Sequence, residues 1–175
     1  HMPCDTIIFV DCRAALSHAA ARIRAGLLLP AQTRNGSGGM AAWEEGTVSS
    51  VDVVGLDVEW KPTSSRMQQE NPASILQVAW RAGLIIFDLL WMRRVFLTAA
   101  GQRGSGGEGG GGEGAEDTLQ MTDVIQELLT SESVLKLGFD FKNDVAKLRA
   151  SYPECKCFDR VYPMLDIASW SRGIN

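Results

Sequence analysis

The sequence has no long apolar run and almost no histidine. No stretch approaches the roughly 20 consecutive apolar residues that a membrane-spanning helix needs. The first residues also lack the charged, apolar and small-residue layout of a signal peptide. We therefore expect an intracellular protein, in the nucleus or cytoplasm, without a membrane partner. Because His1-Met2 resembles an expression scar, the only native histidine is His18.

Cysteine is scarce as well, with four residues in a chain of 175. They lie near opposite ends of the chain, which is unlike the dense disulfide framework of a small secreted domain, so we expect reduced thiols. Cys155 and Cys157 stand too close together for a zinc knuckle, and no second pair accompanies them. The sequence therefore argues against a zinc site.

The negative charge is concentrated in one segment. The net charge of the chain is −4, but residues 101–133 alone carry −6, which leaves +2 for the remainder. Five basic residues fall near the candidate site described below, where they can attract phosphate groups or simply form a solvated surface: Lys61, Arg66, Lys142, Lys147 and Arg149.

Length and composition predict one domain, from residue 3 to residue 175. Residues 30–50 and 101–116, the second with nine glycines between Gly101 and Gly114, are expected to be flexible insertions. A dinucleotide-like glycine pattern at 104–109 does not follow a strand or open a helix, so we reject it. Periodicity predicts strands over 6–10, 51–60, 74–80, 84–88 and 134–137, and helices over 12–24, 89–98 and from Asp117. The three consecutive strands from 51 to 88 suggest an antiparallel meander.

Two carboxylates end the otherwise apolar strand 51–60. Asp57 and Glu59 are two residues apart, so their side chains point to the same face of a sheet. Paired carboxylates at a core edge are costly unless a cation or hydrogen-bond donors compensate them, and hard oxygen ligands suit Mg²⁺ or Mn²⁺. The alternative is that both simply point into solvent.

A second acidic element follows the strand at 134–137. Asp140 is placed to cap a helix whose apolar residues include Phe141 and Leu148. Asp144 lies on the same helical face as these two, so its carboxylate is expected to point inward. A capping contact or a buried ion pair would explain this, but together with Asp57 and Glu59 a shared metal site is the better account.

Three stretches then resemble a known family, the DEDD 3′→5′ exonucleases. They are Val54 to Pro62, Ala73 to Ala79 and Lys136 to Asp144, and the likeness spans residues 5–170 outside the two insertions. The local sequence around Asp57 is most similar to that of the Nibbler-type RNA exonucleases. Ribonuclease D and the Werner exonuclease domain are the next most similar. The resemblance implies a ribonuclease H-like α/β fold, a mixed sheet with an antiparallel meander flanked by helices.

The resemblance also implies a site and a reaction. Asp57, Glu59 and Asp144 would be the catalytic residues and would hold two Mg²⁺ or Mn²⁺ ions for phosphodiester hydrolysis. Asp140 falls where many members carry asparagine, which gives it a supporting role. We assign substrate contacts to the residues that flank the carboxylates: Val58, Trp60, Asp140 and Phe141.

The sequence departs from the family in one respect. Members carry a third motif, a Tyr or His followed by a fourth metal-binding Asp, and no such motif occurs before Asn175. Asp166 resembles the family's strand-to-helix Asp, which is not catalytic. We therefore expect a fragment that lacks the last helices and is inactive or weakly active alone.

The substrate expected from the resemblance is single-stranded RNA, trimmed from its 3′ end. Trp60 and Phe141 could stack on terminal bases, although aromatic residues at such positions are more often part of a core. Two alternatives stay open: a single-stranded DNA 3′→5′ exonuclease, and a catalytically silent scaffold that binds RNA or a protein.

Overall fold

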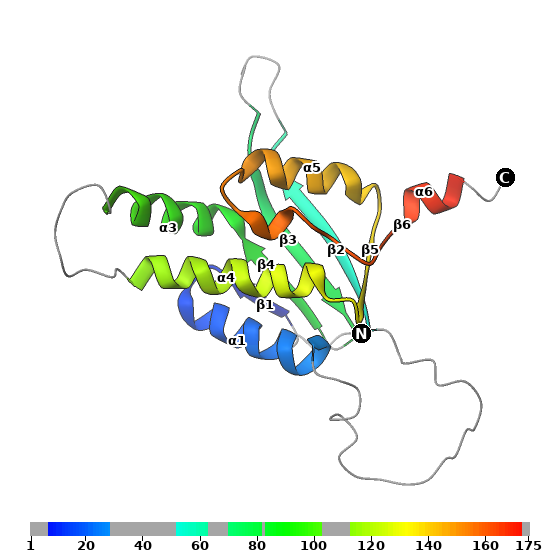
Figure 1. Cartoon of the computed structure of the whole chain (residues 1–175), viewed down its shortest axis with the longest axis horizontal. Coiled ribbons are helices and arrows are strands. Elements are labelled where there is room, and N and C mark those ends of the chain that lie inside the picture. The colour runs from blue at the N-terminus through cyan, green and yellow to red at the C-terminus, as the bar shows by residue number, and fades with distance from the viewer. Residues whose placement is uncertain (1–6, 29–51, 63–69, 82, 103–112, 173–175) are drawn as a thin grey trace, which may run out of the picture.

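The computed structural model describes residues 7–28, 52–62, 70–81, 83–102 and 113–172. For residues 96–102, 113–120 and 171–172 only the backbone is described. Figure 1 shows the elements in chain order. The strands are β1 (Ile7–Val10), β2 (Asp52–Trp60), β3 (Ala73–Trp80), β4 (Gly83–Asp88), β5 (Val134–Gly138) and β6 (Met164–Asp166). The helices are α1 (Arg13–Ile23), α3 (Leu89–Gln102), α4 (Glu113–Thr130), α5 (Phe141–Ser151) and α6 (Ile167–Arg172), with a π-helical turn η2 (Arg24–Leu28) and a 3₁₀ turn η3 (Lys156–Phe158).

The six strands form one mixed sheet in the order β1-β4-β3-β2-β5-β6. β2, β3 and β4 pair antiparallel, which confirms the predicted meander. β1 pairs parallel with β4, β5 with β2, and β6 with β5. The chain between each pair of parallel partners includes helical segments, as crossovers between parallel strands usually do.

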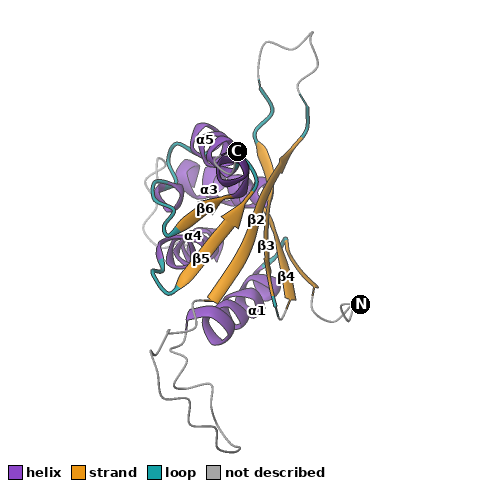
Figure 2. Ribbon diagram, turned by 90° about the vertical axis from the view of Figure 1, so that its right-hand side faces the viewer, coloured by secondary structure: helices purple, strands orange, loops and turns teal. Residues whose placement is uncertain are grey.

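The helices cover one face of this sheet. Along β2 the side chains of Val54, Leu56 and Val58 are buried. The alternate residues Val53, Asp57 and Glu59 are exposed. β4 and β5 show the same alternation of more and less buried residues. Figure 2 shows α3, α4 and α5 along one side of the strands, with α1 near their lower ends. The predicted inward-facing apolar residues therefore form a single core between the helices and one face of the sheet.

Helices α3 and α4 differ most from the expected boundaries. α3 continues to Gln102 and α4 already begins at Glu113, so the ends of the predicted 101–116 insertion are helical. The middle of that insertion and the whole predicted insertion 30–50 lie outside the described residues. Asp88 fixes the start of α3, because its carboxylate accepts a hydrogen bond of 2.8 Å from the backbone N–H of Trp91.

None of the helices in the described part of the chain is long and apolar enough to cross a membrane.

Candidate metal centre and substrate surface

The strand β2 extends beyond its parallel neighbour. β5 pairs with β2 only as far as Gly55 and Leu137, and the last five residues of β2 pair with β3 alone. Asp57 and Glu59 lie in this overhanging section, on the exposed face of the strand. Neither side chain makes a hydrogen bond or ion pair with a described residue. Both carboxylates are therefore free to turn toward a ligand.

Helix α5 packs beside the overhang and contacts both β2 and β3. The chain turns sharply into this helix at Gly138. A Cβ atom at this position would lie 2.5 Å from Cβ of Phe141, so the turn requires glycine here. Asp140 adopts a left-handed conformation with φ 56°. The sequence predicted that its side chain would cap the helix, but the side chain makes no capping hydrogen bond. Its carboxylate instead accepts a hydrogen bond of 2.7 Å from Nδ2 of Asn143. This turn directs the buried face of α5 toward β2.

Asp144 lies on that buried face, as its spacing predicted. Its residue is only 9% exposed, and its carboxylate makes no hydrogen bond or ion pair with a described residue. Burial first, and then the charges of four neighbouring carboxylates, together raise its pKa to about 6; the four are Asp57, Asp140, Glu59 and Asp166. The fold therefore brings residues from β2, α5 and β6 into one negatively charged cluster that no described cation compensates.

Asp166 has a different environment from Asp144. One of its oxygens, Oδ1, accepts hydrogen bonds from the backbone N–H groups of Asp140, at 3.0 Å, and Ala168, at 3.1 Å. Burial opposes its ionisation, but backbone N–H groups, those of Asp140 and Ala168 first, outweigh burial and hold its pKa below the ordinary value. Asp166 thus ties the start of α5 to β6, which agrees with a structural role.

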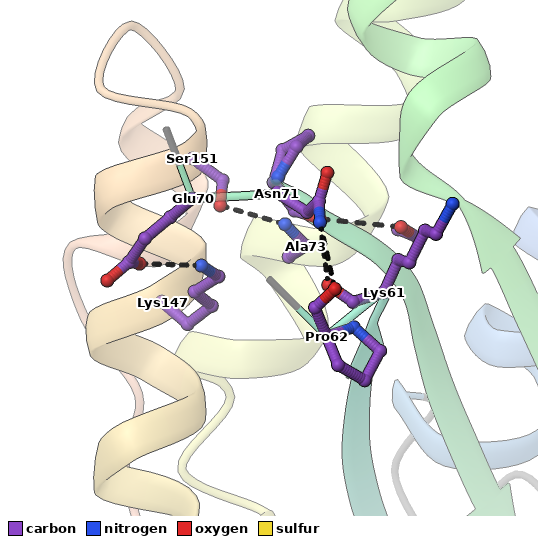
Figure 3. Close-up of polar contacts among 9 residues, drawn as sticks. Lys61, Pro62, Glu70, Asn71, Ala73, Lys147 and Ser151 are labelled. Carbon is purple, nitrogen blue, oxygen red and sulfur yellow. Dashed lines mark hydrogen bonds and ion pairs between the residues drawn. The ribbon is translucent and has the colours of Figure 1, made fainter. Parts of the chain in front are cut away.

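The other end of α5 is tied to β3. Ser151 Oγ accepts a hydrogen bond of 2.9 Å from the backbone N–H of Ala73, and the Tyr152 hydroxyl donates to the carbonyl of the same residue. Figure 3 shows the Ser151 contact at the base of the β2–β3 connection. Held at both ends, α5 keeps Asp144 beside Asp57 and Glu59 despite their mutual repulsion.

The donor chemistry of the cluster suits a hard divalent cation, since it consists of carboxylates alone. In the described part of the chain, however, no three such side chains stand close enough to hold an ion as they are placed. Binding would require the exposed side chains of Asp57 and Glu59 to turn toward Asp144.

The residues expected to contact substrate fall into two groups. Val58 and Phe141 have buried side chains, at 4% and 1% exposure, and belong to the core. For Phe141 this corrects the stacking assignment and favours the core alternative, because Gly138 and the helix cover its ring. Trp60 is half-buried, and Lys147 Nζ lies 5.5 Å from its ring centroid. Trp60 and Asp140 stay accessible to a ligand.

Sequence reasoning named Lys147 as one of five basic residues but missed its partner Glu70 between α5 and the β2–β3 connection. Two cavities lie there, and Glu70, Lys147 and Ala150 line both. The ion pair between Lys147 and Glu70, 2.8 Å, joins residues 77 positions apart, and no local pattern in the sequence indicates it.

Comparison with known proteins adds evidence on the fold alone. No protein-family model and no curated protein matches the sequence. Among solved structures, the Aedes aegypti Nibbler EXO domain is similar with a TM-score of 0.59 and 14% identity, over 99% of this chain and 58% of that chain. Trypanosoma brucei RNase D in complex with GMP has a TM-score of 0.50 and 19% identity, over 92% of this chain and 33% of that chain.

The chain therefore spans less than two thirds of either of these two proteins. At such low identity the likeness concerns the backbone, and the strand order and mixed pairing described above agree with it. The chain has a mixed α/β fold similar to that of the Nibbler EXO domain, in agreement with the ribonuclease H-like fold that its three sequence motifs implied.

Proposed function

We propose that the chain is the core of a metal-dependent nuclease that removes nucleotides from the 3′ end of single-stranded RNA. The observation that carries this proposal is Asp144, a buried carboxylate without a hydrogen bond or ion pair to a described residue, with a pKa of about 6. A fold retains such an uncompensated charge at a cost, and functional sites are where that cost is commonly met. A divalent cation would compensate it.

Three side chains are proposed to hold the metal: Asp57 and Glu59 from β2 and Asp144 from α5. Two Mg²⁺ or Mn²⁺ ions bound there would supply an activated water and neutralise charge on the leaving 3′ oxygen. Asp166 and the contacts at Ala73 hold α5 so that Asp144 stays beside β2. Trp60 and Asp140 would contact the end of the strand.

The preference for RNA is supported by the similar structures. One of them is named RNase D and holds GMP, a ribonucleotide. No described feature of this chain has been linked to a 2′-hydroxyl, so a DNA substrate is an outcome that the assay below must be able to detect.

Metal binding gives the first test, because it can be measured on this chain without catalytic activity. The chain spans only 58% of the similar EXO domain, so the reaction itself is tested separately. Mn²⁺ is titrated by calorimetry into the wild type, Asp57→Ala and Asp123→Asn, the last a control that removes an exposed carboxylate on α4. We expect Asp57→Ala to abolish binding and Asp123→Asn to leave it unchanged. Equal binding by Asp57→Ala and the wild type would refute the metal centre.

The reaction is tested on the full natural chain with 5′-labelled single-stranded RNA and DNA of one sequence in Mn²⁺. We expect a ladder that shortens from the 3′ end of the RNA and is absent for Glu59→Ala. A faster ladder on DNA would reassign the substrate. If Mn²⁺ binds but both strands stay intact, the nuclease proposal fails and the chain is a binding scaffold.

A further inference from the structure

A polar groove runs along α5. It consists of two cavities of about 430 and 420 Å³ that share the lining residues Glu70, Lys147 and Ala150. The groove lies between α5 and the two ends of the β2–β3 connection. Trp60 and Asn143 line one cavity, and they directly follow Glu59 and directly precede Asp144 in the sequence. Trp60 and Asn143 are therefore the lining residues that lie nearest in sequence to the proposed metal ligands.

Two cations from different helices face this groove. Lys147 comes from α5, and its side chain is only 12% exposed. Arg93 comes from α3, is half-buried, and makes no hydrogen bond or ion pair with any residue in the described part of the chain. A guanidinium is always charged and carries five donors, so a half-buried one without a partner is suited to an anion that is not part of the described chain.

The position of Lys147 is fixed, although its anionic partner is exchangeable. Its ammonium lies 5.5 Å from the ring centroid of Trp60 and 2.8 Å from Oε2 of Glu70. The Glu70 side chain is 79% exposed, and the hydrogen bond and charge of Lys147 lower its pKa. Exposed ion pairs of this kind contribute little to stability. An incoming phosphate can therefore replace Glu70 at Lys147 while the lysine stays in place.

The base of the groove is held by hydrogen bonds to the backbone. Asn71 Nδ2 donates to the carbonyls of Lys61, at 3.1 Å, and Pro62, at 3.2 Å, which fastens the two ends of the β2–β3 connection to each other (Figure 3). The bond between Ala73 and Ser151 then fastens this connection to α5. These bonds hold the lining residues Asn71 and Ser151, and the exposed Glu70 side chain is the anion that a strand would displace from Lys147.

We propose that this groove binds backbone phosphates of the single-stranded nucleic acid through Arg93 and Lys147, and that Glu70 competes with the strand for Lys147. This inference rests on the proposed function, because it is the acidic cluster that makes a nucleic acid strand the anion in question. Phosphates next to the cleaved bond would leave the metal centre past Trp60 and Asn143 and enter the groove. The groove would therefore contribute affinity without contacting the reacting atoms.

The test is equilibrium binding of fluorescein-labelled single-stranded oligouridylate and oligodeoxythymidylate, in EDTA so that no metal-dependent cleavage occurs. The variants are Lys147→Gln, Arg93→Gln and Glu70→Gln. Arg24→Gln and Glu127→Gln are the controls, since they make the same charge changes in an exposed ion pair of 3.1 Å between η2 and α4. Circular dichroism melting verifies that each variant is folded.

We expect Lys147→Gln and Arg93→Gln each to weaken binding about fivefold at moderate salt. Each should also reduce the slope of log K against log salt by about 0.7, the value for one lost phosphate contact on a single strand. Glu70→Gln should tighten binding two- to threefold, because it frees Lys147. A variant that merely disturbed the fold would not tighten binding, so the opposite signs identify the competition.

Absence of oligonucleotide binding in EDTA would overturn the groove assignment, as would equal affinities for the groove variants and the controls. So would weaker binding by Glu70→Gln. These results leave the metal centre standing, because the Mn²⁺ titration of Asp57→Ala does not involve the groove. If all the carboxylate variants still bound Mn²⁺, the proposed function would be refuted. The oligonucleotide data would not be affected by that result.

Discussion

Replacing Asp144 with asparagine should stabilise the protein in the absence of metal. Burial, with the charges of neighbouring carboxylates, raises the pKa of Asp144 from 3.8 to about 6. The folded state therefore holds the proton more tightly than the unfolded state, so the free energy of unfolding decreases as the pH rises from about 4 through 6. A shift of about two pKa units corresponds to about 3 kcal/mol, which is the cost of ionising Asp144 in the folded protein at neutral pH.

Urea unfolding in EDTA between pH 4.5 and 8 measures this cost. At pH 4.5 the variant should be more stable by only about 1 kcal/mol, because the carboxyl is still mostly protonated in the folded wild type there. Above pH 7 the variant should be more stable by about 3 kcal/mol. Asp123→Asn, which removes an exposed carboxylate from α4, should show no such difference. An Asp144→Asn variant that is less stable than the wild type at pH 8 would refute the reasoning.

Saturating Mn²⁺ should reverse the order of stability. A ligand present at 1,000 times its Kd stabilises the folded state by about 4.1 kcal/mol, which exceeds the cost of about 3 kcal/mol for ionising Asp144. The wild type should gain this stabilisation, whereas Asp144→Asn should gain little because it has lost a proposed ligand. If metal stabilised both proteins equally, Asp144 would be a buried charge without a part in the site.

Three further substitutions test how the site is held. Tyr152→Phe should lower the free energy of unfolding by about 1 kcal/mol, since the Ala73 carbonyl loses its hydrogen bond, as urea unfolding will show. Asp140→Gly should be about 1 kcal/mol more stable than Asp140→Ala in the same assay, because both lose the side chain and only alanine is strained at φ 56°. Burial lowers the pKa of Lys136 to about 8, so the stability of the wild type relative to Lys136→Met should rise between pH 8 and 10.5 by roughly 3 kcal/mol, and a constant difference would contradict this.

Local patterns in the sequence were sufficient for most of the elements. Alternation along 51–60 placed Asp57 and Glu59 on one face of β2, and helical spacing placed Asp144 on the buried face of α5. Both signals depend only on neighbours within one element, so they survive in the fold. The antiparallel pairing of β3 and β4 was predictable for the same reason, because the short turn between Trp80 and Gly83 leaves these strands little alternative. The longer connection between β2 and β3 sets no such limit on their pairing.

Contacts between distant segments were not predictable. Lys136 was expected only as part of a strand, yet its residue is fully buried, and its ammonium donates to the carbonyls of Ser131 and Tyr162. The Lys147–Glu70 ion pair likewise depends on how α5 packs against the β2–β3 connection. Phe141 was assigned to substrate because it adjoins Asp140, whereas its position against Gly138 is set by the turn into α5. These features follow from packing, on which a single sequence carries little information.

The position of the acidic cluster is explained by where the sheet ends. β5 leaves β2 after Gly55, and the overhang that follows has one edge without a strand partner. α5 contacts β2 and lies beside this overhang, and it is anchored at its first turn by Asp166 and at its last by Ala73. The two anchors act on the backbone and involve none of the three proposed ligands. The fold can therefore keep Asp144 ionised next to Asp57 and Glu59, at a cost that the anchors and the core offset, until a cation binds.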